Sequence, residues 1–399
     1  MLERKASRRR LLGFLAEVFV RIERLARPAS IPDLGALQNV LILEYIVPLG
    51  NCVHMTPLFE VIKRARPETK VTVATWGIGL QVLRNSPYVD DLLATPDPLK
   101  DLIGAVSSLR RQLKARRLKP DCCLTGTADQ RTKIGLVAAM VCSGWRGGLT
   151  LLPALYQRPL SHDRSVSLIE NNLQLAKLLG ISADAIEPRV FYSPRDAEVA
   201  RKLLEPFRVS GRSVLVAVTQ NSGGLPTAWH DDRWAETLRY AHRVLGYDIL
   251  YVGTTADASA IADLKALAGG VGASLAGKTS INQVAALIAL SDMVITLTTG
   301  TMHVTRAVGT PMVVLGLAWE KPLEWMVLDR PKIRILRGPE LEHAPPDYRM
   351  DEISVQWVTA ELADMTKLFP PDNAAREARL MASLSEVDHL GDRDESRIP

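Results

Sequence analysis

Short apolar runs alternate with longer amphipathic stretches from residue 39 onward, and this alternation predicts repeated β-α units. The first half contains four apolar runs that predict strands, at 39–47, 70–76, 89–95 and 121–126. Helical periodicity is found at 56–66, 99–117, 130–142 and 165–181. Strands that alternate with helices are typical of a parallel sheet covered by helices on both faces.

A second series of the same kind begins after residues 182–196, which lose periodicity and contain Pro188 and Pro194, as a linker between domains does. Strands are predicted at 213–219, 248–254, 293–298 and 312–317, and helices at 231–245, 257–268 and 280–290. A helix at 352–369 follows and is expected to cross back to the first domain. The predicted parts are an arm (1–37), two domains (38–187 and 188–345), a crossing helix (346–370) and a disordered tail (371–399).

Each series predicts a doubly wound α/β domain. Right-handed crossovers place the carboxyl ends of all parallel strands at one edge of a sheet, and ligands bind at that edge. Two such domains that face each other enclose a cleft, which is the expected place for chemistry.

Composition narrows the class of protein to which this sequence can belong. The 399 residues are 47% hydrophobic and 23% charged, the balance of a soluble globular protein. No apolar stretch is long enough to span a membrane, and the first 27 residues lack a secretory pattern. The four cysteines have no metal-ligand spacing and are expected to be buried thiols in a reducing compartment, which predicts a cytoplasmic protein without a metal site.

The net charge of +5 is concentrated in the arm. Residues 1–27 hold eight basic and three acidic residues, so the rest of the chain is formally neutral, unlike a nucleic-acid-binding domain. Apolar side chains recur at helical spacing within 6–27, with arginines on the other faces. Such a helix can lie on an anionic membrane surface. The alternative is a helix that packs on the protein body or on a partner chain.

The stretch "TTGTMHVTRAVGTP" (298–311) joins a predicted strand to a predicted helix. Free N–H groups at a helix N-terminus, together with the helix dipole, suit a phosphate. The alternative is a simple capping turn, with Thr298 or Thr299 as N-cap, Gly300 at the bend and His303 packed inside.

Three segments resemble glycosyltransferase family 9, the bacterial heptosyltransferase family of the lipopolysaccharide inner core. They are 41–67, with "IVPLGNCVHMTPLFEV", 85–93 ("NSPYVDDLL") and 275–316, with "LAGKTSINQVAALIALSDMVITLTTG". The resemblance spans roughly residues 39–330 in order and spacing. It implies a GT-B fold, two Rossmann-like domains facing across a cleft, and inverting transfer with no essential metal.

The resemblance also implies roles for single residues in the second domain. The donor diphosphate and sugar would lie beside Thr299, Gly300, Thr301 and His303. Asp257 matches a position that binds the nucleotide ribose, although a helix N-terminal charge is its alternative role. Residues Lys278, Thr279 and Ser280 match the segment that lines the base, and the loop 219–224, with Ser222, is a further donor-binding candidate.

Three positions depart from the family pattern. Asn51 stands where the family has a catalytic aspartate, Thr227 where it has a phosphate-binding lysine, and Thr298 where it has a donor-contacting aspartate. An asparagine amide can orient a hydroxyl group but cannot accept its proton at neutral pH. Candidate replacement bases are Glu44, His54 and Asp129, each of which can instead be structural.

The sequence therefore favours a glycosyltransferase at the inner face of the cytoplasmic membrane. It would use a nucleotide-sugar co-substrate, with ADP as one candidate nucleotide, no cofactor, and a lipid-linked cell-surface glycan as acceptor. The main alternative is a catalytically silent GT-B protein that binds sugar nucleotides or acts as a scaffold at the membrane. A nucleotide-sugar epimerase is a third hypothesis.

Overall fold

The computed structural model divides the chain into two compact units between Pro188 and Arg189. It describes Phe14, Glu17, Val18, Ile22 and residues 34–183, 186–209, 211–220, 228–325, 330–343, 345 and 347–388. Apart from those four positions, the expected membrane helix of residues 6–27 lies outside the described residues. In the described part, no helix combines the length and the apolar character that crossing a membrane requires.

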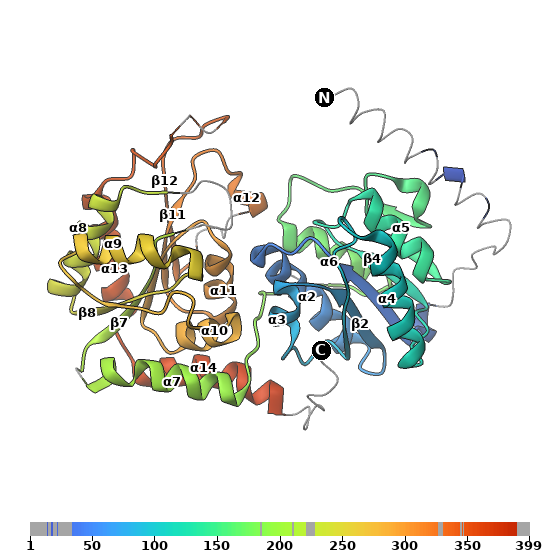
Figure 1. Ribbon diagram of the computed structural model, residues 1–399, viewed down its shortest axis with the longest axis horizontal. Helices are drawn as coiled ribbons and strands as arrows, with labels where there is room; N and C mark the ends of the chain where they lie inside the picture. The colour runs from blue at the N-terminus through green and yellow to red at the C-terminus, as the bar shows by residue number, and fades with distance from the viewer. Residues whose placement is uncertain are drawn as a thin grey trace. The chain divides into compact units, whose positions relative to one another are not determined.

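The N-terminal unit, drawn from blue to green in Figure 1, is built on a six-stranded parallel sheet. The order of its strands is β3-β2-β1-β4-β5-β6. Its strands are β1 (Asn39–Glu44), β2 (Lys70–Thr75), β3 (Asp91–Ala94), β4 (Cys122–Thr125), β5 (Trp145–Leu149) and β6 (Arg158–Leu160). β1 lies at the centre, where Val40 is paired with Val71 on one side and Cys122 on the other. The strand order reverses between β1 and β4, and this reversal marks the expected ligand-binding point of an open α/β sheet.

Helices connect these strands. They are α2 (Leu49–Ala65), α3 (Ile78–Leu83), α4 (Leu102–Ala115), α5 (Thr132–Val141) and α6 (Leu168–Leu178), with 3₁₀ turns η1 (Leu34–Ala36) and η2 (Pro153–Leu155). α6 begins with a capping box between Ser167 and Glu170, and Gly180 follows its end with a φ of 72° that favours glycine. The expected buried thiols are confirmed, since all four cysteines are free and buried.

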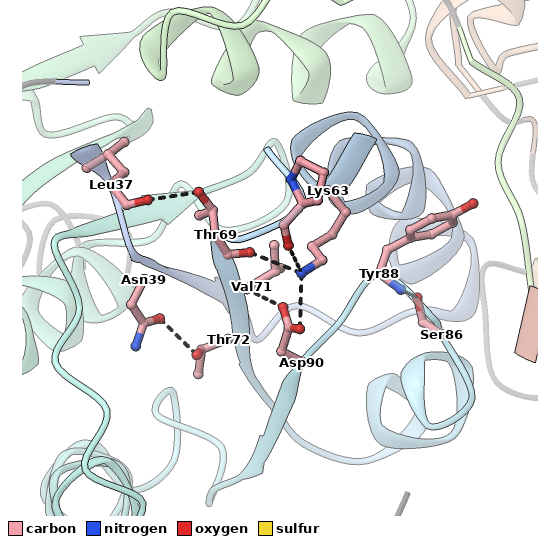
Figure 2. A network of polar contacts seen from close by, with 10 residues as sticks. Leu37, Asn39, Lys63, Thr69, Val71, Thr72, Ser86, Tyr88 and Asp90 are labelled. Carbon is pink, nitrogen blue, oxygen red and sulfur yellow. Dashed lines mark hydrogen bonds and ion pairs between the residues drawn. The ribbon is translucent and has the colours of Figure 1, made fainter. Parts of the chain in front are cut away.

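The C-terminal end of α2 is fixed by a polar network at the amino edge of this sheet (Figure 2). The Lys63 ammonium donates to the carbonyls of Pro67 (2.8 Å) and Thr69 (3.2 Å) and to Asp90 Oδ1 (3.1 Å). Asp90 Oδ2 accepts the Val71 N–H at 2.7 Å, so the same carboxylate holds both α2 and the start of β2. This anchoring gives the opposite end of α2, which lies at the carboxyl edge, a defined position.

The C-terminal unit repeats the architecture, with a six-stranded parallel sheet in the order β12-β11-β10-β7-β8-β9. Its strands are β7 (Ser213–Val218), β8 (Tyr247–Tyr251), β9 (Ala273–Ser274), β10 (Met293–Leu297), β11 (Met312–Gly316) and β12 (Ile333–Arg337). Here the order reverses between β7 and β10. The predicted pair of doubly wound α/β sheets is thus confirmed.

The helices of this unit cover both faces of its sheet (Figure 1). They are α7 (Pro194–Val209), α8 (Asp231–Arg243), α9 (Ala258–Leu267), α10 (Ile281–Ala289), α11 (Gly300–Val308), α12 (Pro322–Trp325), α13 (Val355–Leu368) and α14 (Asn373–Asp388), with the 3₁₀ turn η3 (Thr255–Asp257). α7 lies where the sequence predicted the end of a linker, and it packs against α10.

Two expectations for the C-terminal segment are wrong. The tail was expected to be disordered, but residues 373–388 form α14, which packs against α10 and α11. Two arginines of α14 hold it against the rest of the unit. Arg376 Nε lies 2.8 Å from Asp292 Oδ1, and Arg379 Nε donates to the Ala289 carbonyl at 3.0 Å. The helix expected to cross back to the first domain is α13, which belongs to the C-terminal unit and packs on its α8 and β11.

Candidate functional site

The first group of candidate residues gathers where the order of the N-terminal sheet reverses. Glu44 is the last residue of β1, and Asn51 lies in the first turn of the following helix α2. Asp129 follows the neighbouring strand β4. Because parallel neighbours end at the same edge, these residues from distant parts of the sequence lie close together.

Asp129 fixes the loop that leaves β1. Its Oδ1 accepts hydrogen bonds from the N–H groups of Tyr45 (2.9 Å) and Ile46 (3.0 Å). Burial raises the pKa of Asp129 from 3.8 to about 7, although the two N–H donors oppose the shift. This carboxyl group therefore titrates near neutral pH, as a general base should.

Glu44 is a second buried carboxyl group beside the first. Burial, and then the charge of Asp129, raise the pKa of Glu44 well above its usual range, while a hydrogen bond from the Cys52 thiol lowers it. Within the described ranges, neither carboxyl oxygen of Glu44 has a nitrogen or oxygen partner. The raised pKa favours the protonated form of Glu44, so this group suits a base less well than Asp129 does.

Asn51 and His54 are both buried and lie one turn apart on α2. The His54 carbonyl accepts a hydrogen bond from Asn172 Nδ2 at 3.3 Å, and Asn172 Oδ1 accepts the Thr127 N–H at 2.9 Å. Asn172, on α6, thus joins the start of α2 to the loop after β4. Sequence reasoning missed it because nothing in the helical pattern of α6 distinguishes a buried bridging amide.

In the C-terminal unit, the candidate donor residues in the described segments all follow the carboxyl ends of strands: Asp257 after β8, Thr279 after β9 and the joint 298–303 after β10. The first two segments touch. The Gly277 N–H donates to the Gly253 carbonyl at 3.0 Å, and a Cβ atom at Gly277 would lie 2.5 Å from Thr255 Oγ1. With a φ of 69°, Gly277 allows this close approach.

Asp257 has the capping contacts of its alternative role. Its Oδ2 accepts both the N–H and the hydroxyl of Thr254, each at 2.7 Å, and so closes the turn that starts α9. Ser280 likewise caps α10 through the Gln283 N–H at 3.2 Å, and exposed Lys278 donates to the Ser274 carbonyl at 3.1 Å. These contacts give the segments a fixed shape at the sheet edge.

The joint 298–303 lies where the second sheet reverses its order, between β10 and β7. Thr299 is the N-cap of α11, but its side chain makes no capping hydrogen bond to the first turn. The Thr298 hydroxyl instead donates to the Leu315 carbonyl at 3.3 Å, and Gly300 opens the helix without a side chain. His303 is buried one turn further on. The helix N-terminus therefore lacks the side-chain oxygen that normally satisfies its N–H groups.

Ser222 and Thr227 lie in residues 221–227, outside the described residues. A residue that the sequence did not single out is Glu320, in the loop after β11, where burial raises the pKa of its carboxyl group to about 7 against the opposing charge of Arg337. Glu320 lies three residues after the apolar run 312–317. In the described part of the chain, no group of three or more His, Cys, Asp or Glu side chains could hold a metal ion.

Comparison with known proteins identifies the class. Residues 133–318 match the model of glycosyltransferase family 9 (heptosyltransferase). Together with the two doubly wound sheets, which match the GT-B fold of solved relatives, this match shows that residues 133–318 form a glycosyltransferase family 9 domain.

Individual relatives are distant but match over nearly their whole length. Lipopolysaccharide heptosyltransferase 3 of Escherichia coli (strain K12) is 22% identical over 358 residues, 83% of this chain and 99% of the relative. A family 9 glycosyltransferase from Veillonella parvula DSM 2008 superposes with a TM-score of 0.74 at 17% identity, over 84% of this chain and 98% of that one. ADP-heptose lps heptosyltransferase II of E. coli superposes with a TM-score of 0.67 at 20% identity. The superposition covers 82% of this chain and 98% of that one.

Proposed function

We propose that the protein transfers a sugar, with inversion and without a metal ion, from a nucleotide-activated donor to a lipopolysaccharide-like acceptor. The observation that carries this proposal is the uncapped N-terminus of α11 at the reversal point of the second sheet, within the segment that matches family 9. The curated relative acts on lipopolysaccharide by its name, and one solved relative is described with ADP-2-deoxy-2-fluoro heptose. An ADP-linked heptose is therefore the first donor to test.

The C-terminal unit binds this donor. The N–H groups of Gly300 and Thr301 and the dipole of α11 stabilise the diphosphate as it leaves, a task that a metal ion performs in other transferases. Asp257 and Thr279, on two touching segments of the same edge, bind the nucleoside. Transfer is accordingly expected to continue in the presence of EDTA.

The N-terminal unit binds the acceptor and removes its proton. Asn51 orients the acceptor hydroxyl by a hydrogen bond, and Asp129 is the general base, because its pKa of about 7 lets it accept a proton at working pH. Burial and the charge of Asp129 favour the protonated form of Glu44, and His54 is buried, so we assign both a role in supporting the fold around the base.

Three single variants separate these roles. Asp129→Asn preserves the carbonyl oxygen that accepts the two backbone N–H groups but cannot take a proton, so the transfer rate should fall about 10²- to 10⁴-fold. Glu44→Gln mimics the protonated acid and should retain activity within a few fold. A comparable loss in Glu44→Gln or His54→Ala, with Asp129→Asn fully active, would assign the base elsewhere.

The competing hypothesis is a silent GT-B protein that binds sugar nucleotides or acts as a scaffold at the membrane. It is favoured by Asn51, an amide at the position where the family has its catalytic aspartate. If native protein binds a nucleotide sugar but turns over no donor, this second function replaces the first.

The enzyme would work at the inner face of the cytoplasmic membrane, where residues 6–27 bind anionic lipid. The support is the excess of basic residues and the apolar stripe in that segment. A lipid-linked acceptor requires such a location.

A further inference from the structure

The loop after β11 lies beside the proposed diphosphate site. β10 and β11 are parallel neighbours, with Leu297 paired to Leu315, so the segments that follow them leave the same edge side by side. The hydroxyl of Thr298 donates to the Leu315 carbonyl at 3.3 Å and ties the two strand ends together. Trp319 and Glu320 are the first partly exposed residues of the second segment.

Arg337, at the end of β12, holds this loop in one shape. Its guanidinium donates to the carbonyls of Leu317 (2.9 Å), Ala318 and Glu320 (2.9 Å). The rings of Trp319 and Tyr348 also pack in a T-shaped arrangement, with centroids 4.8 Å apart. A loop that is held at three carbonyls within four residues and by an aromatic contact presents its side chains from a fixed backbone.

One carboxyl oxygen of Glu320, Oε2, has no hydrogen-bond partner among the described residues. Arg337 uses its donors on backbone carbonyls, and Oε2 of Glu320 is shielded from water and accepts no hydrogen bond from the residues that the structure describes. A buried carboxyl oxygen without a donor is costly, and such atoms in native proteins commonly mark a place for a missing donor.

We infer that Glu320 binds hydroxyl groups of the donor sugar and so determines which sugar the enzyme accepts. This inference rests on the proposed function, because it assumes that the diphosphate lies at α11. A carboxylate would repel the phosphates, so Glu320 must face a neutral part of the donor that carries hydrogen-bond donors. Sugar hydroxyls meet both conditions, and carboxylates accept hydrogen bonds from them strongly. The neighbouring residues Thr298 to Thr301 carry no charge, so they offer no carboxylate to a sugar hydroxyl.

The test compares binding of ADP and of ADP-heptose to native protein and to Glu320→Gln by calorimetry. Glu340→Gln, which changes an exposed carboxylate in the segment after β12, is the matched control. We expect Glu320→Gln to weaken ADP-heptose binding about 10- to 100-fold, as for a lost hydrogen bond to a charged group, and to leave ADP binding unchanged. The control should change neither affinity.

Three results would overturn the inference, and each is distinct. Equal affinities of native and Glu320→Gln protein for ADP-heptose would show that Glu320 does not contact the sugar. Equal weakening of ADP and ADP-heptose would place Glu320 at the nucleoside or assign it a structural role, which a lowered melting temperature would identify. If native protein binds ADP but not ADP-heptose, or binds neither, the proposed donor is wrong. The inference about Glu320 is then wrong as well, because it assumes that donor.

Discussion

Replacement of Asp129 by asparagine should make the protein more stable at alkaline pH while it removes activity. Asparagine has the same shape and can still accept the N–H groups of Tyr45 and Ile46, but it never ionises. In the native protein, burial raises the pKa of Asp129 from 3.8 to about 7. An acid with a raised folded-state pKa stabilises the fold below its unfolded pKa, and this stability is lost as the pH rises through the folded pKa.

The size of this change in the free energy of unfolding follows from the shift in the pKa of Asp129. A difference of about three pKa units corresponds to about 4 kcal/mol of stability lost by pH 8, most of it between pH 5 and pH 8. The free energy of unfolding of Asp129→Asn, relative to native protein, should therefore grow by about 3 kcal/mol over that interval. A gain in stability that accompanies a loss of function is the usual sign of a residue retained for its chemistry.

Urea unfolding at pH 5 and pH 8, followed by tryptophan fluorescence, measures this difference. Asp121→Asn is the matched control, because Asp121 also accepts two backbone N–H groups, of Gln38 and Asn39, each at 2.8 Å, but in a less buried place at the amino edge of the same sheet. This control tests whether an amide in place of a carboxylate that accepts two backbone N–H groups is enough to produce the difference. If the relative stability of Asp129→Asn is the same at both pH values, burial does not raise the pKa of Asp129 and its assignment as base loses its support.

Further predictions concern the donor site and the arm. Gly300→Leu should abolish binding of the nucleotide sugar without unfolding the protein, because a bulky side chain would cover the first turn of α11; unchanged affinity by calorimetry would exclude a diphosphate there. Asp257→Ala should lower the stability of the C-terminal unit by about 1 kcal/mol through loss of the cap, and should also weaken ADP binding if the carboxylate contacts ribose; a purely structural residue would change only the melting temperature. A chain that begins near residue 30 should remain soluble and lose binding to anionic liposomes, and equal co-sedimentation of both forms would assign residues 6–27 another task.

The sequence predicted the fold class because buried parallel strands leave uninterrupted apolar runs, as in β10 and β11. It missed β5, whose segment "WRGGL" contains two glycines that are rare inside strands, and β6, which is three residues long. It also missed α14, where arginine contacts to the end of α10 accompany the buried side chains of Leu380 and Leu384.

The candidate site was predictable where it depends on local pattern alone. Glycine and threonine directly after an apolar strand located the joint 298–303, and the structure puts it at the reversal point of the sheet. The raised pKa of Asp129 was not predictable, since it depends on burial against β1, more than 80 residues earlier. Glu320 escaped notice for the same reason: its lack of a partner follows from how Arg337, on the next strand, uses its donors.

The most direct measurement is sugar transfer by native protein, alongside Asp129→Asn and Asn51→Asp, with ADP-heptose and related nucleotide sugars and a lipid-linked lipopolysaccharide core acceptor. If the chain is an active enzyme with a relocated base, the native protein should form product, with or without EDTA. The transfer rate of Asp129→Asn should then be about 10²- to 10⁴-fold lower. Product that appears only with Asn51→Asp, while native protein binds donor and releases nothing, would show that the chain is a silent relative.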